Sequence, residues 1–196
     1  TADITVAFSE IESGSSTAQT TGSFASVTKT DVHGVATAVF TPSHDAGVDT
    51  RLVATGNTKT GHSAVVSTVF GALDHFTVSP ATATDLAVDQ TLNVSAQAED
   101  VYGNPVETAD ITVVFSEIKS DSEDAQTTGL FGSVTKTDSS GVATAVFTPS
   151  HSAGTATRLV ATGGGQSGNS GIVTAVFGAL HDWAVSPSSA TDLAGD

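Results

Sequence analysis

One spacing of 107 residues runs through the sequence and limits what the chain can fold into. The segment Thr1–Glu10 returns at Thr108–Glu117 with a single substitution, and Gly34–His44 returns unchanged at Gly141–His151. The offset is 107 residues in both cases, the difference between positions 108 and 1 and between 141 and 34. Such a spacing is near the usual size of a domain and longer than the unit of a solenoid. The sequence therefore predicts a tandem array of whole domains.

The spacing also predicts where the domains lie. We expect residues 1–73 to form a repeat lacking its first strands, 74–180 a complete repeat, and 181–196 the start of a third. The first repeat has no segment equivalent to His75–Ser79 or Thr91–Ala98. We favour a window cut from a longer array. The alternative is that residues 181–196 of one molecule complete the open first repeat of another by strand addition.

Short alternating stretches predict β-strands throughout. In Thr91–Ala98, for example, apolar residues occupy every second position, so Leu92 and Val94 face the same side. Turn residues separate the stretches, as at Asp100–Pro105, and no stretch has helical periodicity. We expect strands near 75–79, 91–98, 110–117, 130–137, 142–148, 157–162 and 172–177, with loops at 118–129 and 163–171. The predicted fold is all-β, with tandem immunoglobulin-like β-sandwiches of about seven strands per repeat.

The charge balance excludes some partners. There are 21 acidic and 6 basic residues, a net charge of −15. Such a surface repels nucleic acid and anionic lipid. We therefore expect no nucleic-acid binding. No apolar run is long enough to span a membrane as a helix, so we also expect no membrane insertion. The sequence has no cysteine, which excludes disulfides and thiol chemistry.

Four segments carry a resemblance to a known family. They are Phe76–Pro80, Ala98–Val106, Asp110–Phe115 and Thr137–Thr144. Together they resemble the bacterial immunoglobulin-like repeats of the invasin and intimin type, found in large cell-surface proteins. The resemblance implies an extracellular location, a rod of stacked sandwiches, and neighbouring repeats of the same protein as partners. It also implies that calcium is a candidate ligand, because some arrays of this kind are stiffened by calcium at their junctions.

Oxygen-bearing side chains near the expected junction are the candidate calcium ligands, since this cation prefers carboxylate and carbonyl oxygens. We select Asp74, Asp100, Asn104 and Asp138. Asp85 and Asp89 lie nearby in the sequence, and Asp31 is the equivalent of Asp138 in the first repeat. The alternative is that these side chains cap turns through hydrogen bonds to the backbone. No other cofactor is predicted.

Catalytic patterns are absent from the sequence. His44 and His151 repeat in equivalent loops without a second histidine at zinc-like spacing, and no nucleophile-elbow context occurs. We therefore expect no enzyme. The predicted function is a structural spacer or stalk repeat of an extracellular surface protein, of the adhesin or surface-layer type. One alternative is a filament subunit that self-associates head to tail through strand complementation. Another is a glycan-binding module, which would need an exposed aromatic platform. Tyr102 and Trp183 are the only Tyr and Trp, and Trp183 takes the place of Phe76, so we expect it to pack in the junction or core and see no platform in the sequence.

Overall fold

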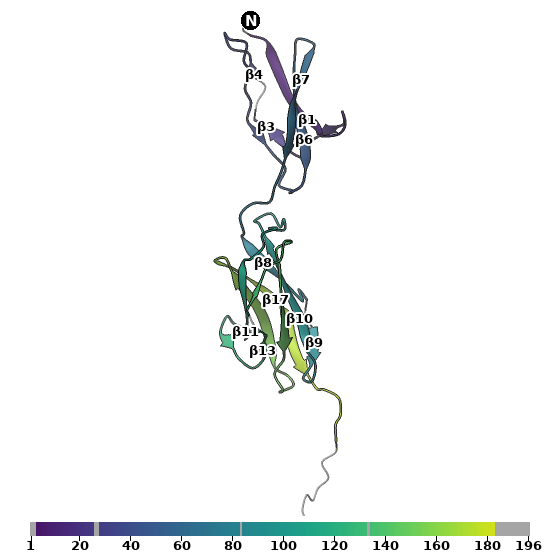
Figure 1. Ribbon diagram of the computed structural model, residues 1–196, viewed down its shortest axis with the longest axis vertical. Helices are drawn as coiled ribbons and strands as arrows, with labels where there is room; N and C mark the ends of the chain where they lie inside the picture. Colours follow the sequence, from purple (N-terminus) through teal and green to yellow (C-terminus); the bar gives the residue numbers. More distant parts are fainter. Residues whose placement is uncertain (1–2, 26–27, 83, 133, 183–196) are drawn as a thin grey trace, which may run out of the picture.

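The computed structural model describes residues 3–25, 28–82, 84–132 and 134–182. In these residues the chain forms strands β1 to β17 and no helix. Accordingly, no helix in the described part of the chain is long and apolar enough to cross a membrane. The strands β1–β7 pair only with one another, and so do β8–β17. Figure 1 shows these two strand sets one beyond the other along the long axis.

The first strand set is built around β1. Its strands are β1 (Thr5–Glu12), β2 (Ala18–Gln19), β3 (Ser23–Phe24), β4 (Thr28–Lys29), β5 (Phe40–Thr41), β6 (Asp49–Gly56) and β7 (Lys59–Ser67). One sheet has the order β2-β1-β6-β7, with β4 also paired to β1. The facing sheet consists only of β3 and β5. All of these pairs are antiparallel.

The second strand set contains the same elements and three more. Its strands are β8 (His75–Ser79), β9 (Thr84–Ala87), β10 (Leu92–Glu99), β11 (Thr112–Lys119), β12 (Ala125–Gln126), β13 (Leu130–Phe131), β14 (Thr135–Lys136), β15 (Val142–Thr148), β16 (Ala156–Gly163) and β17 (Gln166–Val176). One sheet has the order β13-β15-β10-β8. The other has the order β12-β11-β16-β17-β9, with β14 paired to β11 and β9 parallel to β17.

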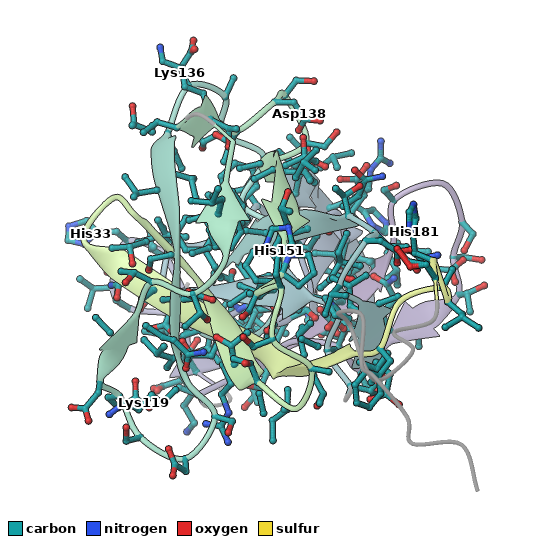
Figure 2. The ribbon with its side chains drawn as sticks, turned by 90° about the horizontal axis from the view of Figure 1, so that it is seen from below. His33, Lys119, Lys136, Asp138, His151 and His181 are labelled. Carbon is teal, nitrogen blue, oxygen red and sulfur yellow. The ribbon has the colours of Figure 1, made fainter. Side chains whose placement is uncertain are left out.

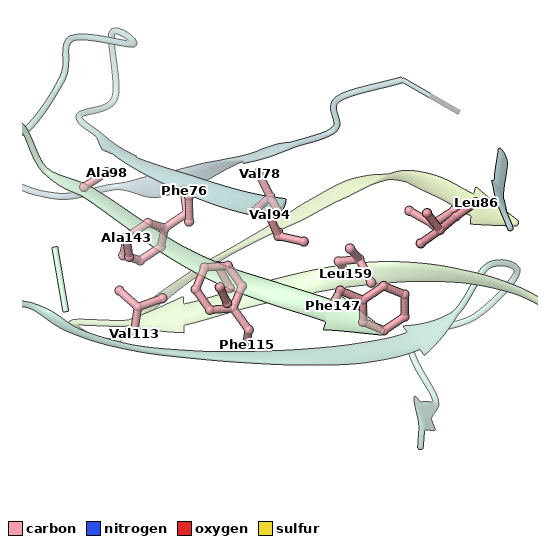
Figure 3. Packing of buried hydrophobic residues seen from close by; sticks show 14 of the residues in the cluster. Phe76, Val78, Leu86, Val94, Ala98, Val113, Phe115, Ala143, Phe147 and Leu159 are labelled. Carbon is pink, nitrogen blue, oxygen red and sulfur yellow. The ribbon is translucent and has the colours of Figure 1, made fainter. Parts of the chain in front are cut away.

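The core of the second strand set lies between these two sheets. The alternation in β10 places Val94, Ala96 and Ala98 inside, at 0–1% exposure, and confirms the predicted face of this strand. Large apolar side chains from both sheets meet them: Phe76, Val78, Val113, Phe115, Phe147 and Leu159 (Figure 3). Burying side chains of this size is the main source of stability in such a domain. The predicted all-β immunoglobulin-like sandwich is confirmed, with seven strands of four or more residues in this set.

Three local predictions were wrong. Residues 163–171 were expected to form a loop, but β17 begins at Gln166. Gly164 and Gly165 have positive φ angles and turn the chain tightly back onto β16. Strand β9 was missed, because Thr84–Ala87 has only one large apolar residue. The single strand expected at 130–137 is instead two short strands, β13 and β14, which pair with different sheets.

A buried glutamate anchors the acidic loop after β11. Glu117 is 4% exposed, and its Oε1 accepts hydrogen bonds from the backbone N–H of Gly129 at 2.8 Å and from the Thr128 hydroxyl at 3.3 Å. The equivalent Glu10 accepts the same bond from Gly22 at 2.8 Å. A buried carboxylate requires such donors. Neither glutamate was predicted as an anchor, although the two occupy identical positions in the two copies of the sequence.

Candidate functional site

The place where the two strand sets meet is the candidate site. A turn that follows β10, Asp100–Pro105, lies against the loop at 43–47 of the first set and against the linker at 68–74. Backbone and side-chain groups from all three segments converge there. The site is therefore a junction between strand sets.

Asp100 closes its own turn. Its Oδ1 accepts hydrogen bonds from the backbone N–H groups of Tyr102 and Asn104, both at 2.9 Å. The N–H of Gly103 donates to the Asp100 carbonyl at 3.0 Å, and Gly103 supplies the positive φ of 83° that the turn needs. Asp100 is only 2% exposed. This is the turn capping that the sequence analysis weighed against metal binding.

Three hydrogen bonds join this turn to the neighbouring segments. The backbone N–H of Gly71, in the linker, donates to Asp100 Oδ2 at 2.8 Å. Asn104 Nδ2 donates to the carbonyl of His44 at 2.7 Å, and Asn104 Oδ1 accepts from the N–H of Ala46 at 2.9 Å. Asn104 Nδ2 also lies 2.9 Å from Asp100 Oδ2. A single turn thus joins the second strand set to the first set and to the linker.

The donors around Asp100 favour its charged form. The N–H of Gly71 is the largest cause, and the side-chain amide and backbone N–H of Asn104 add to it, so the pKa of Asp100 lies well below its ordinary value. The same effect, on a smaller scale, lowers the pKa of Asp31, mainly through the backbone N–H of Val35. The Asp100 carboxylate is therefore negative at any physiological pH.

This shift predicts a pH dependence. Because the folded pKa is depressed, Asp100 stabilises the fold fully above its ordinary pKa of 3.8, and this contribution is lost as the pH falls toward the folded value. Replacing Asp100 with Asn removes the charge. We expect the stability difference between wild type and Asp100→Asn to be constant from pH 7 to about pH 5 and to shrink below about pH 4. Urea titrations at several pH values measure it. A difference that does not change with pH would contradict the assignment.

Two aromatic rings flank the same junction. The rings of His44 and Tyr102 stack with centroids 4.0 Å apart and an interplanar angle of 20°. They border an open hollow of about 440 Å³, which is also lined by Pro42, Val69 and Leu73. Tyr102 remains 60% exposed. The stack adds an apolar contact to the hydrogen bonds between the first strand set and the turn.

The linker is fixed a second time where it enters β8. The N–H of Asp74 donates to the carbonyl of Glu99 at 2.8 Å. His75 lies between two carboxylates, with Nδ1 3.2 Å from Asp74 Oδ2 and Nε2 3.2 Å from Glu99 Oε2. At the equivalent point after β17, His181 Nδ1 lies 3.2 Å from Asp182 Oδ2. The exchange of acid and histidine between the two copies thus keeps a neighbouring His–Asp contact.

The structure brings together only part of the predicted calcium set. Asp100 and Asn104 are in direct contact, and Asp74 is in the adjoining linker. Asp138 (labelled in Figure 2) belongs to the turn before β15. There its Oδ1 accepts hydrogen bonds from the backbone N–H groups of Ser140 and Val142. Within the ranges that the structure describes, no three His, Asp or Glu side chains gather closely enough to hold a metal ion. Trp183, which was expected to pack in the junction or core because it takes the place of Phe76, lies outside the described residues.

The partners of the turn were not predicted from the sequence. Gly71, His44 and Ala46 contribute backbone groups, and a backbone group leaves no residue-specific pattern in a sequence. Gly71 did leave one signal, since Phe70–Leu73 is identical to Phe177–Leu180. A side chain at position 71 would have its Cβ 3.3 Å from Asp100 Oδ2, so the close approach favours glycine.

No protein-family model and no curated protein sequence matches the chain. Solved structures with a similar arrangement include domains of bacterial adhesins. Invasin, a bacterial integrin-binding protein, matches at 17% identity and a TM-score of 0.40 over 93% of this chain and 34% of that chain. The D00–D0 domain of intimin matches at 16% identity and a TM-score of 0.48, over 86% and 78% of the two chains.

A third similar structure comes from an enzyme. A glycosyl hydrolase family 2 member from Bacteroides cellulosilyticus matches at 14% identity and a TM-score of 0.45. The match covers 71% of this chain and 18% of that chain. Thus the chain spans about a fifth of the hydrolase and a third of invasin. At these identities the similarity concerns the fold.

Proposed function

We propose that the chain is a structural spacer repeat of an extracellular surface protein, of the adhesin or surface-layer type. The observation that carries this proposal is the hydrogen-bonded junction around Asp100 and Asn104. A spacer must keep successive units in a defined orientation so that a distant part of the protein is held away from the cell. The sequence resemblance to invasin-type and intimin-type repeats supports the extracellular location.

The linker suits this role because it is short and fixed at two points. It runs between the end of β7 at Ser67 and the start of β8 at His75. Gly71 is bound to Asp100 near its middle and Asp74 to Glu99 at its end. A flexible linker would need free backbone along its length. Two anchors within this segment limit the angles that the two strand sets can adopt.

The charge of the chain favours separation between neighbouring molecules. With a net charge of −15, parallel rods of this composition repel one another over distances near the Debye length, about 8 Å at physiological salt. The proposed partners are the neighbouring repeats along the same protein. The proposed boundaries remain residues 1–73, 74–180 and 181–196.

Immunolabelling of intact cells that express the parent protein tests the location. Antibodies raised against residues 74–180 are expected to label unpermeabilised cells, and brief external protease treatment is expected to remove the label. An intracellular marker protein, stained in parallel, controls for leakage. Label that is seen only after permeabilisation would contradict an extracellular spacer.

Calcium binding at the junction remains a proposal. It would use oxygen atoms of Asp74, Asp100, Asn104 and Asp138, although the Asp100 oxygens already accept five hydrogen-bond contacts. Thermal unfolding with and without millimolar calcium tests it. A calcium-dependent rise of the midpoint that Asp74→Asn reduces would support the site. An unchanged midpoint at all calcium concentrations would contradict it.

Glycan binding is the second candidate function, favoured by the exposed Tyr102 beside the hollow at the junction. Aromatic faces of this kind can stack on sugar rings. A glycan array probed with the wild-type chain and with Tyr102→Ala distinguishes the two functions. Saturable binding that is lost in Tyr102→Ala would favour the glycan module, whereas a spacer is expected to give no saturable signal.

A further inference from the structure

The first strand set has an open apolar face where the second has a filled core. Phe147 and Leu159 are buried, at 1% and 0% exposure. Their equivalents 107 residues earlier, Phe40 and Leu52, are only half-buried. Equivalent side chains are thus buried in the second strand set and partly exposed in the first. The two sets differ in the strands that cover these side chains.

A missing strand partner explains the difference. In the second set, β15 pairs with β13 along one edge and with β10 along the other. In the first set, the equivalent β5 pairs only with β3 and has shrunk to Phe40–Thr41. The preceding residues are not a strand, and Val35 and Val39 are 54% and 68% exposed. This edge is open to another strand.

A hollow of about 360 Å³ lies beside the open edge. It is lined by apolar side chains from both sheets of the first set, including Phe8, Phe24, Ala38, Phe40, Leu52 and Ala54. In the second set, the equivalents of these residues surround Phe76, Val78 and Val94, which β8 and β10 supply (Figure 3). The hollow is therefore lined by the same residues as the core of the second set, but it lacks the three side chains that fill that core.

Two equivalent glycines, Gly168 and Gly61, show the same difference: another backbone segment covers the first and none covers the second. A Cβ placed on Gly168 in β17 would lie 1.7 Å from the carbonyl oxygen of Phe76, because β8 lies directly on this glycine. A Cβ on Gly61 in β7 would meet nothing within 4 Å. A glycine inside a strand often marks the close approach of another backbone. Gly61 thus keeps room for a backbone that the described chain does not place there.

We propose that this face of the first strand set is an acceptor groove for a β-strand segment with the sequence of residues 74–100, supplied by a second copy of the repeat. The register follows from β10 and β15, where Leu92 lies opposite Phe147 and Val94 opposite Ala145. In the groove, Leu92 of the incoming segment lies opposite Phe40 and Val94 lies opposite Ala38. Main-chain hydrogen bonds provide the affinity, and the apolar pockets select the sequence. This binding does not depend on the spacer role.

One difference between the two sets bears on the path of the incoming segment. Ala64 stands where the second set has Gly171, whose Cβ would lie 2.4 Å from the backbone of Thr82. The connection after β8 of the incoming segment therefore follows a different path at this point. The backbone atoms that Gly171 approaches belong to Ala81 and Thr82, outside β8 and β10, so the two incoming strands keep their path.

Fluorescence anisotropy of a labelled peptide of residues 74–100, titrated with the chain of residues 1–196, tests the groove. We expect saturable binding, and hydrogen–deuterium exchange is expected to slow at residues 35–41 and 59–67 on addition of the unlabelled peptide. A peptide carrying Val94→Asp, which would place a charge in the apolar hollow, is expected to bind at least about tenfold more weakly.

Gly61→Val provides the matched test on the side of the groove. The free chain has room for this side chain, so its unfolding is expected to stay unchanged, whereas the affinity for the peptide falls by about tenfold or more. Gly14→Val, in an exposed turn with equal room, is expected to leave the affinity unchanged.

The proposal would be overturned by unchanged affinity in Gly61→Val, by the absence of saturable binding, or by protection of residues 142–148 in place of 35–41, which would mean exchange into the second set. A peptide of residues 181–196 that binds more tightly than the peptide of residues 74–100 would assign the groove to that segment instead.

Discussion

Replacing Phe147 with alanine is expected to lower the free energy of unfolding of the second strand set by about 3–5 kcal/mol. Phe147 is 1% exposed and packs against Phe131, with ring centroids 4.9 Å apart. The ring fills the space between the two sheets, so its removal leaves a cavity as well as losing buried apolar area. Stability of a typical domain is only about 5–15 kcal/mol, so this loss is a large fraction.

Phe40→Ala is the matched control for Phe147→Ala. The two phenylalanines occupy equivalent positions, and Phe40 has the same ring neighbour, Phe24, at 4.9 Å. Phe40 borders an open hollow, so its removal costs less, about 1–2 kcal/mol in the first strand set. Denaturant titration read out by hydrogen–deuterium exchange of β15 and β5 measures each set separately. Equal losses at the two positions would contradict the difference between a filled and an open core.

Gly168→Val is expected to destabilise the second strand set by about 3–6 kcal/mol. The new side chain would overlap the Phe76 carbonyl, 1.7 Å from the position of its Cβ, and would push β8 away from β17. Phe76 and Val78 would then lose their burial, which is worth about 1.5–3 kcal/mol for each side chain. The same titration measures the effect, with faster exchange expected first in β8. A variant as stable as wild type would show that β8 does not rest on this glycine.

The fold could be predicted from local pattern because the strands bury one face each. Alternation alone identified the buried side of β10, from Val94 to Ala98. The same reasoning failed at the glycine-rich start of β17, which was predicted to be a loop. Gly168 and Gly171 look like loop residues, yet they are glycines because other backbone segments lie on them. This close approach becomes visible only when the structure places those backbone segments beside β17.

The candidate site was predicted in part. Asp100 and Asn104 were identified as turn residues, because an aspartate followed by Gly103 and Pro105 is a strong turn signal. Their reach across the junction could not be predicted, since Asn104 binds backbone groups of His44 and Ala46 about sixty residues away. Contacts at such sequence separation depend on how the two strand sets pack.

The proposed spacer role requires that the turn at Asp100–Pro105 keeps the two strand sets in one relative orientation. Pulsed electron spin resonance between labels on Val65→Cys and Thr162→Cys measures this orientation, because both positions are exposed and the chain has no native cysteine. We expect a narrow distance distribution in the wild-type background and a clearly broader one after Asn104→Ala. A broad distribution in the wild-type background, or one that Asn104→Ala leaves unchanged, would contradict that role.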